Sequence, residues 1–190
     1  PENTERTLAL AHERAKALDI KTMLVATTSG KTALYAAELC QEMKVIAVTH
    51  STGFREPDLQ ELTPDNRAAI ELAGGQILTC QHALGGVNRA VRKKWGTYQL
   101  DEIIAYTLRI LGQGVKVVAE ISLMAADAGL VRTDEPVMAV GGSGWGADTA
   151  AVVLPTNAQT FFDLQIPEIV CRPSPKHPGK KKLRSVTHST

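Results

Sequence analysis

The chain has 190 residues, with 21 Lys or Arg against 20 Asp or Glu, and 44% of its residues are hydrophobic. A chain of this length can bury a core of its own without disulfides or a structural metal. Its three cysteines lie far apart and form no Cys-x-x-Cys pair, which argues against a disulfide scaffold or a cysteine zinc site. We therefore expect a cytoplasmic protein without a bound metal. No run of about 20 apolar residues is present, so we expect no membrane span.

The charge is unevenly distributed along the chain. Residues 172–190 carry six Lys or Arg and no acidic residue, which leaves 15 basic against 20 acidic residues in residues 1–171. We interpret residues 1–172 as a single domain and residues 173–190 as a basic, solvated tail. A tail that contacts nucleic acid or a neighbouring subunit is the alternative. With eight aromatic residues and no nucleic-acid-binding module in the body, we do not expect a nucleic-acid partner.

Helices and strands are expected to alternate along the domain. Helical periodicity predicts the helices, and short apolar runs predict the strands. In chain order we expect a helix over 4–18, a strand over 23–26, a helix over 31–43, a strand over 44–49, a helix over 64–73, a strand over 76–80, helices over 100–111 and 115–130, and strands over 137–140, 150–154 and 169–171. Residues 115–118 alone would also fit a strand, but the length of the apolar stretch favours a helix. This order predicts a three-layer α/β/α sandwich with a mainly parallel sheet.

A loop suited to phosphate follows the first predicted strand. It consists of Thr27, Thr28, Ser29, Gly30, Lys31 and Thr32. It is not a Walker A motif, because that motif requires glycine where this chain has Val25. Three hydroxyl residues, a glycine and a lysine at the start of a helix nevertheless favour an anion, because a helix N-terminus offers unpaired N–H groups and partial positive charge. The alternative is a hydroxyl-rich cap that serves only the backbone.

A second glycine-rich loop follows the strand predicted over 137–140. It is formed by Gly141, Gly142, Ser143, Gly144, Trp145, Gly146, Ala147, Asp148 and Thr149. Such a loop can form an anion nest or lie against a flat ligand, with Trp145 covering an aromatic ring. The alternative is a mobile turn with the tryptophan packed on the surface. Asp148 can accept a hydrogen bond from a ligand or cap the loop, and the sequence leaves both roles open.

His50, Glu120 and Asp148 are candidates for acid–base catalysis, and Glu120 has a possible partner in Asp127. His50 follows a predicted strand, with Gly53 and Phe54 close behind, where sheets of this type bind ligands. Glu120 and Asp127 lie seven residues apart on one face of a predicted helix and could act as acid and base. The alternative is that each pairs with a lysine or closes a helix end. No arrangement of nucleophile, base and orienting residue can be identified.

The sequence from residues 24 to 33, followed by residues 45–49, resembles the start of the C-terminal domain of pyruvate kinase. In that domain the corresponding loop binds a sugar phosphate of the allosteric effector. Residues 115–131, 139–149 and 161–163 resemble small stand-alone relatives of the domain in archaea and bacteria, and the resemblance covers about residues 4–173. It implies a phosphate cradle made of Thr27, Ser29, Gly30, Lys31 and Thr32. Lys31 stands where pyruvate kinases usually have arginine, which keeps the charge but loses bidentate geometry.

The resemblance implies the effector-binding fold and, since it does not extend to the catalytic barrel, no pyruvate kinase activity. The stand-alone relatives suggest flavin mononucleotide (FMN) as the ligand, with Phe54 and Trp145 beside its ring, and we expect a homo-oligomer. Two alternatives stay open: an enzyme that acts on a sugar phosphate or related metabolite, and a regulatory subunit whose basic tail binds a partner. The sequence does not decide whether the bound molecule reacts.

Overall fold

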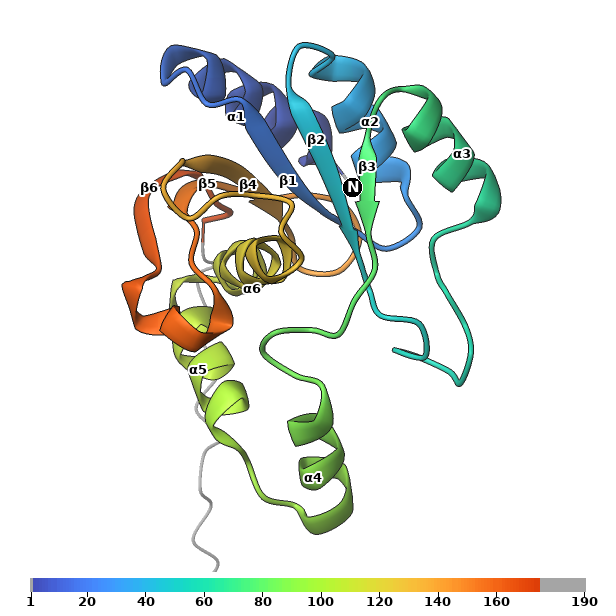
Figure 1. The fold of residues 1–190 in the computed structure, drawn as a ribbon, viewed down its shortest axis with the longest axis vertical. Helices are drawn as coiled ribbons and strands as arrows, with labels where there is room; N and C mark the ends of the chain where they lie inside the picture. The colour runs from blue at the N-terminus through green and yellow to red at the C-terminus, as the bar shows by residue number, and fades with distance from the viewer. Residues whose placement is uncertain (1, 175–190) are drawn as a thin grey trace, which may run out of the picture.

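The computed structural model describes residues 2–174, which form a single six-stranded sheet with helices on both faces (Figure 1). The strands lie in the order β3-β2-β1-β4-β5-β6. Their bounds are Thr22–Thr27 for β1, Lys44–Thr49 for β2, Gln76–Leu78 for β3, Val137–Gly141 for β4, Thr149–Leu154 for β5 and Gln165–Cys171 for β6. All neighbouring strands from β3 to β4 pair in parallel, whereas β5 runs antiparallel to both β4 and β6. The prediction of a mainly parallel sheet is confirmed.

Helices cover both faces of this sheet and complete the three predicted layers. On one face lie α1 (Thr4–Ala17), α2 (Lys31–Leu39) and α3 (Pro64–Leu72), with α1 packed against β4, β5 and β6, and α2 against β1 and β2 (Figure 1). The long helix α6 (Gln113–Asp127) covers β1, β4 and β5 on the other face. The three-layer α/β/α architecture is therefore confirmed.

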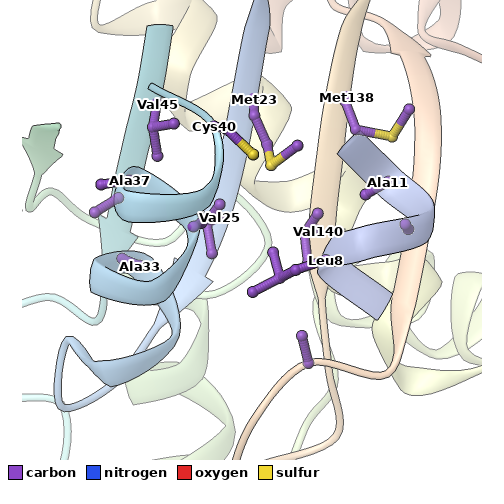
Figure 2. Close-up of a cluster of buried hydrophobic side chains, with 14 of the residues drawn as sticks. Leu8, Ala11, Met23, Val25, Ala33, Ala37, Cys40, Val45, Met138 and Val140 are labelled. Atoms are coloured by element: carbon purple, nitrogen blue, oxygen red, sulfur yellow. The ribbon is translucent and has the colours of Figure 1, made fainter. Parts of the chain in front are cut away.

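The central strand β1 contributes to both halves of the core. Met23 and Val25 pack with α1 and α2, as Figure 2 shows, and Leu24 between them packs in the cluster under α6. Successive strand residues point to opposite faces, so a strand that is covered on both faces is apolar throughout. Cys40 lies in the first cluster, and burial raises the pKa of its thiol to about 11, so it is protonated at neutral pH. It packs there as a small apolar side chain.

Most predicted elements are present, with shifted ends. α3 begins as expected, because Thr63 accepts a hydrogen bond from the Asn66 amide and Pro64 occupies the first turn. α2 ends at Leu39 rather than residue 43, where Cys40 leaves helical geometry. The helix predicted over 100–111 is divided into α5 (Leu100–Leu108) and a 3₁₀ turn (Arg109–Leu111), and a further 3₁₀ segment spans Ala158–Asp163. The last strand begins four residues earlier than expected.

One helix was not predicted. α4 (Val87–Trp95) carries four basic residues and has no buried side chain. With α5 it extends away from the sheet, and we call residues 84–111 the arm (Figure 1). Of the predicted tail over 173–190, all but the first two residues lie outside the described part of the chain. Within residues 2–174, none of the helices is both long and apolar enough to cross a bilayer.

Candidate functional site

A cavity of about 640 Å³ lies where the parallel strands β1, β2 and β4 end, and both glycine-rich loops line it. This is the edge of the sheet at which ligands bind in α/β folds, and the volume lies in the usual range for small-molecule sites. The first loop contributes Thr27, Thr28, Ser29, Lys31 and Thr32, and the second contributes Gly142, Ser143, Gly144, Trp145 and Gly146. His50, Phe54 and Glu120 also line the cavity.

The first loop has a fixed backbone around an uncapped helix end. Gly30 has a φ of +100°, and its amide donates to Thr27 Oγ1 at 3.2 Å. Asn66, at the start of α3, donates to the Ser29 carbonyl at 2.7 Å. No side chain in the described residues caps the N-terminus of α2. The first-turn amides and the exposed Lys31 are therefore available to an anion, because Lys31 forms no ion pair within residues 2–174.

The second loop is held closed by its own hydrogen bonds. The Asp148 carboxylate accepts from the hydroxyl of Ser143 at 2.8 Å and from that of Thr149 at 2.7 Å. A Cβ on Gly142 would lie 2.2 Å from the Gly146 carbonyl oxygen, so the two sides of the loop are in contact. Asp148 thus makes the contacts expected of a residue that caps the loop, and its role toward a ligand stays a prediction.

Aromatic and imidazole rings gather on the β2 side of the cavity. Phe54 stacks on His50 at 4.1 Å and on His82 at 4.8 Å between ring centroids, and Arg89 lies 4.9 Å above the Phe54 ring. His50 Nδ1 contacts Glu61 Oε2 at 2.6 Å, and the Glu61 side chain is only 9% exposed. The glutamate fixes the imidazole as a base-orienting carboxylate does. Phe54 packs against these groups, so a flat ligand ring would meet its edge or displace a neighbour.

The wall formed by α6 contains a buried ion pair. Lys116 Nζ contacts Glu120 Oε2, and the two side chains are 5% and 4% exposed. Glu120 Oε1 accepts from the Leu84 amide at 3.1 Å, and His82 Nδ1 lies 3.5 Å from Oε2. Burial alone would raise the pKa of Glu120, but nearby His82 and Lys116 outweigh it and lower that pKa to about 2. Glu120 is therefore ionised at neutral pH.

Glu120 and Asp127 do not act together, although the sequence places them on one face of α6. Asp127 Oδ1 accepts from the side chain of Asn157 at 3.0 Å and from the Ala158 amide at 3.1 Å. Asp127 does not line the cavity. The two carboxylates thus have separate partners, one a lysine and the other a chain segment at the helix end.

Five expected site residues do not line the cavity. These are Gly30, Gly53, Gly141, Asp148 and Thr149, which are absent from its lining. Thr149 is packed against the start of α6, where a Cβ on Gly114 would lie 2.0 Å from Thr149 Oγ1. Gly141 is similarly in contact with α6, near Val117. Gly141 and Thr149 therefore set how closely the second loop approaches α6.

The charged side chains of the lining are mainly basic, and the sequence did not indicate most of them. Among the described residues that line the cavity, five are Lys or Arg and two are carboxylates. The lining residues not expected to lie there include Arg55, His82, Arg89, Arg109 and Lys116. Arg55 pairs with Glu61 at 2.8 Å, whereas Arg89 and Arg109 have no carboxylate partner within residues 2–174. Over the same residues, no three His, Cys, Asp or Glu side chains gather closely enough to hold a metal ion.

One protein family matches most of this chain, and two solved structures are distantly similar to it. The family described as "Pyruvate kinase, alpha/beta domain" matches residues 5–153. A crystal structure of a pyruvate kinase from Cryptosporidium parvum matches at 15% identity with a TM-score of 0.42, over 78% of this chain and 22% of that one. A second structure of pyruvate kinase from the same organism matches at 14% identity and a TM-score of 0.40, over 78% and 21%. The chain thus spans about a fifth of the length of these enzymes.

Proposed function

The chain belongs to the family of the pyruvate kinase alpha/beta domain, and we propose that it binds a phosphorylated small molecule between its two glycine-rich loops. One observation carries this proposal. The uncapped N-terminus of α2, with the loop hydroxyls and Lys31, faces a cavity in which basic side chains outnumber acidic ones. Backbone amides and a lysine together favour a phosphate over a neutral group.

The charge of the cavity supports the same conclusion. Residues 1–171 carry more acidic than basic residues, so an average region of the surface they form would have a negative potential. The cavity has the opposite sign, and Lys31, Arg89 and Arg109 form no ion pair within the described chain. An anionic ligand would supply the missing negative charge.

For the ligand body, FMN is the specific candidate. Trp145 lines the cavity and is 64% exposed, so one ring face is accessible beside Arg55, whose guanidinium lies 5.4 Å from the ring centroid. Phe54 is covered by His50, His82 and Arg89. A flavin ring would therefore stack on Trp145, with its phosphate at the first loop.

Titration with inorganic phosphate, FMN and riboflavin tests the proposal, because FMN and riboflavin differ only in the phosphate. We expect calorimetry to show phosphate and FMN binding, with riboflavin much weaker. Lys31→Ala should weaken phosphate binding about tenfold, since a charge-assisted hydrogen bond contributes about 1.5–3 kcal/mol.

Lys93→Ala is the matched control, because it removes the same charge from an exposed position of α4 outside the cavity. If Lys31→Ala and Lys93→Ala weaken phosphate binding equally, the proposed site is wrong. If the protein binds phosphate but not FMN, the phosphate site is supported and FMN is rejected as the ligand.

A further inference from the structure

Lys116 is a buried amine on the wall of the cavity. Its side chain is 5% exposed, yet it lines the same space as the first loop. A buried ammonium group costs several kcal/mol of solvation unless it is well paired. Lys116 has one ion-pair partner in the described chain, Glu120, four residues further along α6. The position therefore combines limited solvation with access to a bound ligand.

The surroundings of Lys116 act on its ammonium group in opposite directions. Burial lowers the pKa of the ammonium below its usual range, although Glu120 acts in the opposite direction. The positive charges of Arg109 and Arg89 lower this pKa further. A neutral lysine amine is a nucleophile, and desolvation together with neighbouring cations is how proteins activate such amines.

Groups that can accept and return a proton lie beside the amine. Glu120 contacts the lysine directly, and His82 Nδ1 lies 3.5 Å from the same glutamate oxygen. The His82 side chain is 12% exposed, and neither ring nitrogen has a hydrogen-bond partner within residues 2–174. Buried polar atoms are nearly always hydrogen-bonded, so the His82 Nε2 atom at the cavity wall is free to bond to a ligand.

We propose that Lys116 forms an imine with the carbonyl carbon of the bound ligand, so that the substrate class is a phosphorylated aldehyde or ketone. The proposal rests on the phosphate-binding part of the proposed function and not on FMN, which has no aldehyde or ketone group: the first loop would hold the phosphate of the ligand while its carbonyl group reaches α6. Lys116, Glu120 and the first loop line one cavity, so a single ligand can contact all three. The cavity would then be an active site as well as a binding site.

The chemistry balances without an added oxidant or reductant. The Lys116 nitrogen lone pair forms a bond to the carbonyl carbon, and the carbonyl π electrons move to the oxygen. The nitrogen gives a first proton to the Glu120–His82 pair, which passes it to that oxygen and so forms a hydroxyl group. The nitrogen then gives its second proton to the pair, which passes it to the hydroxyl group, and water leaves as the nitrogen lone pair forms the C=N bond. The net reaction converts an amine and a carbonyl compound into an imine and water.

Reduction with borohydride tests the step, because it converts an imine into a stable secondary amine. The full chain is incubated with glyceraldehyde 3-phosphate, reduced with sodium borohydride and mapped by peptide mass spectrometry. We expect one adduct per chain, on Lys116, and none at that position in Lys116→Arg, which keeps a cation beside Glu120. Lys116→Gln is a second variant, and circular dichroism checks that both fold. Glyceraldehyde without phosphate should label Lys116 at least tenfold less.

The outcomes separate this inference from the proposed function. If Lys116 stays unmodified while the protein binds phosphate through Lys31, the imine proposal is wrong and the phosphate-binding proposal stands. If labelling of Lys116 requires the phosphate group of the probe and is suppressed by inorganic phosphate, both the imine and the phosphate site are supported. Labelling spread equally over exposed lysines such as Lys93 and Lys94, and unchanged in Lys116→Arg, overturns the imine.

Discussion

Gly30 links the conformation of the phosphate loop to the packing of α3. Its φ of +100° lies in the left-handed region that disfavours residues with a side chain. A Cβ at this position would also lie 2.6 Å from Leu62 Cδ1 and 2.7 Å from Asn66 Cβ. Asn66 is the residue that holds the Ser29 carbonyl, so a shift of α3 would also alter the loop.

Replacement of Gly30 by alanine should therefore destabilise the protein and weaken phosphate binding. We expect Gly30→Ala to lower the free energy of unfolding by about 3 kcal/mol, from a strained φ and a close contact together. Urea denaturation measures this change. Gly74→Ala is the matched control, because Gly74 has a φ of +82° with nothing within 4 Å of its Cβ position. It should cost about 1 kcal/mol and leave phosphate binding intact, and equal losses in the two variants would contradict the packing argument.

At single positions the sequence identified loop residues better than wall residues. Thr27 to Thr32 are found because they follow an apolar strand and precede a helix, and both signals are local. Arg55, Arg89 and Arg109 come from separate segments whose approach depends on the tertiary fold, so no local pattern marks them. Lys116 had a readable signal. It lies four residues before Glu120 in an apolar helix, which is the spacing of an ion pair.

At the scale of elements, α6 carries both the core and the reactive wall. Val118, Ile121 and Ala125 pack against the sheet, while Lys116 and Glu120 line the cavity. Both partners of the ion pair lie on the helix that these apolar residues hold against the sheet. The stability of α6 therefore depends on whether Lys116 and Glu120 are charged.

Glu120→Gln should reveal this coupling as a change in acid stability. The pKa of Glu120 is about 2 in the folded protein against an ordinary value of 4.5, so the folded state binds fewer protons in this range. The stabilisation is present above pH 4.5 and is lost as the pH falls toward 2. Denaturation at a series of pH values should show a steeper loss in the parent than in the variant between these limits.

The same substitution should also lower stability at pH 7 by about 3 kcal/mol, because it leaves a buried lysine without its counter-charge. Glu71→Gln is the control, since Glu71 pairs with Arg67 at 3.4 Å on the exposed side of α3. A surface pair of this kind contributes less than about 1 kcal/mol. Parallel pH profiles for the parent and Glu120→Gln would show that the pair does not stabilise the fold.

The elements themselves were predicted where burial dictates the sequence. The inner residues of β1, β2 and β4 are apolar because both faces are covered, and α3 shows its cap and proline. The family assignment from the first strand and loop is confirmed. α4 was missed because it buries nothing, so no apolar face is required of it.

At the scale of the whole molecule, the cavity lies between two parts of unequal stability. The sheet and α6 are held by buried side chains, whereas the arm contains α4 without buried residues and α5 with two. Arg89 and Arg109 of the arm line the same cavity as the first loop. A ligand that contacts both parts would join the arm to the sheet, so its binding depends on how firmly the arm is held.

Hydrogen exchange should show this difference in local stability. Amides of α4 should exchange at least tenfold faster than those of α6, because opening α4 exposes no buried apolar side chain. Arg92 Nε contacts Glu102 Oε1 at 2.6 Å and connects α4 to α5. Arg92→Gln should raise exchange in α4 and leave α6 unchanged, whereas Lys93→Gln, which removes the same charge one residue away, should change neither. Protection in α4 equal to that in α6 would mean that contacts beyond this ion pair hold the arm in place.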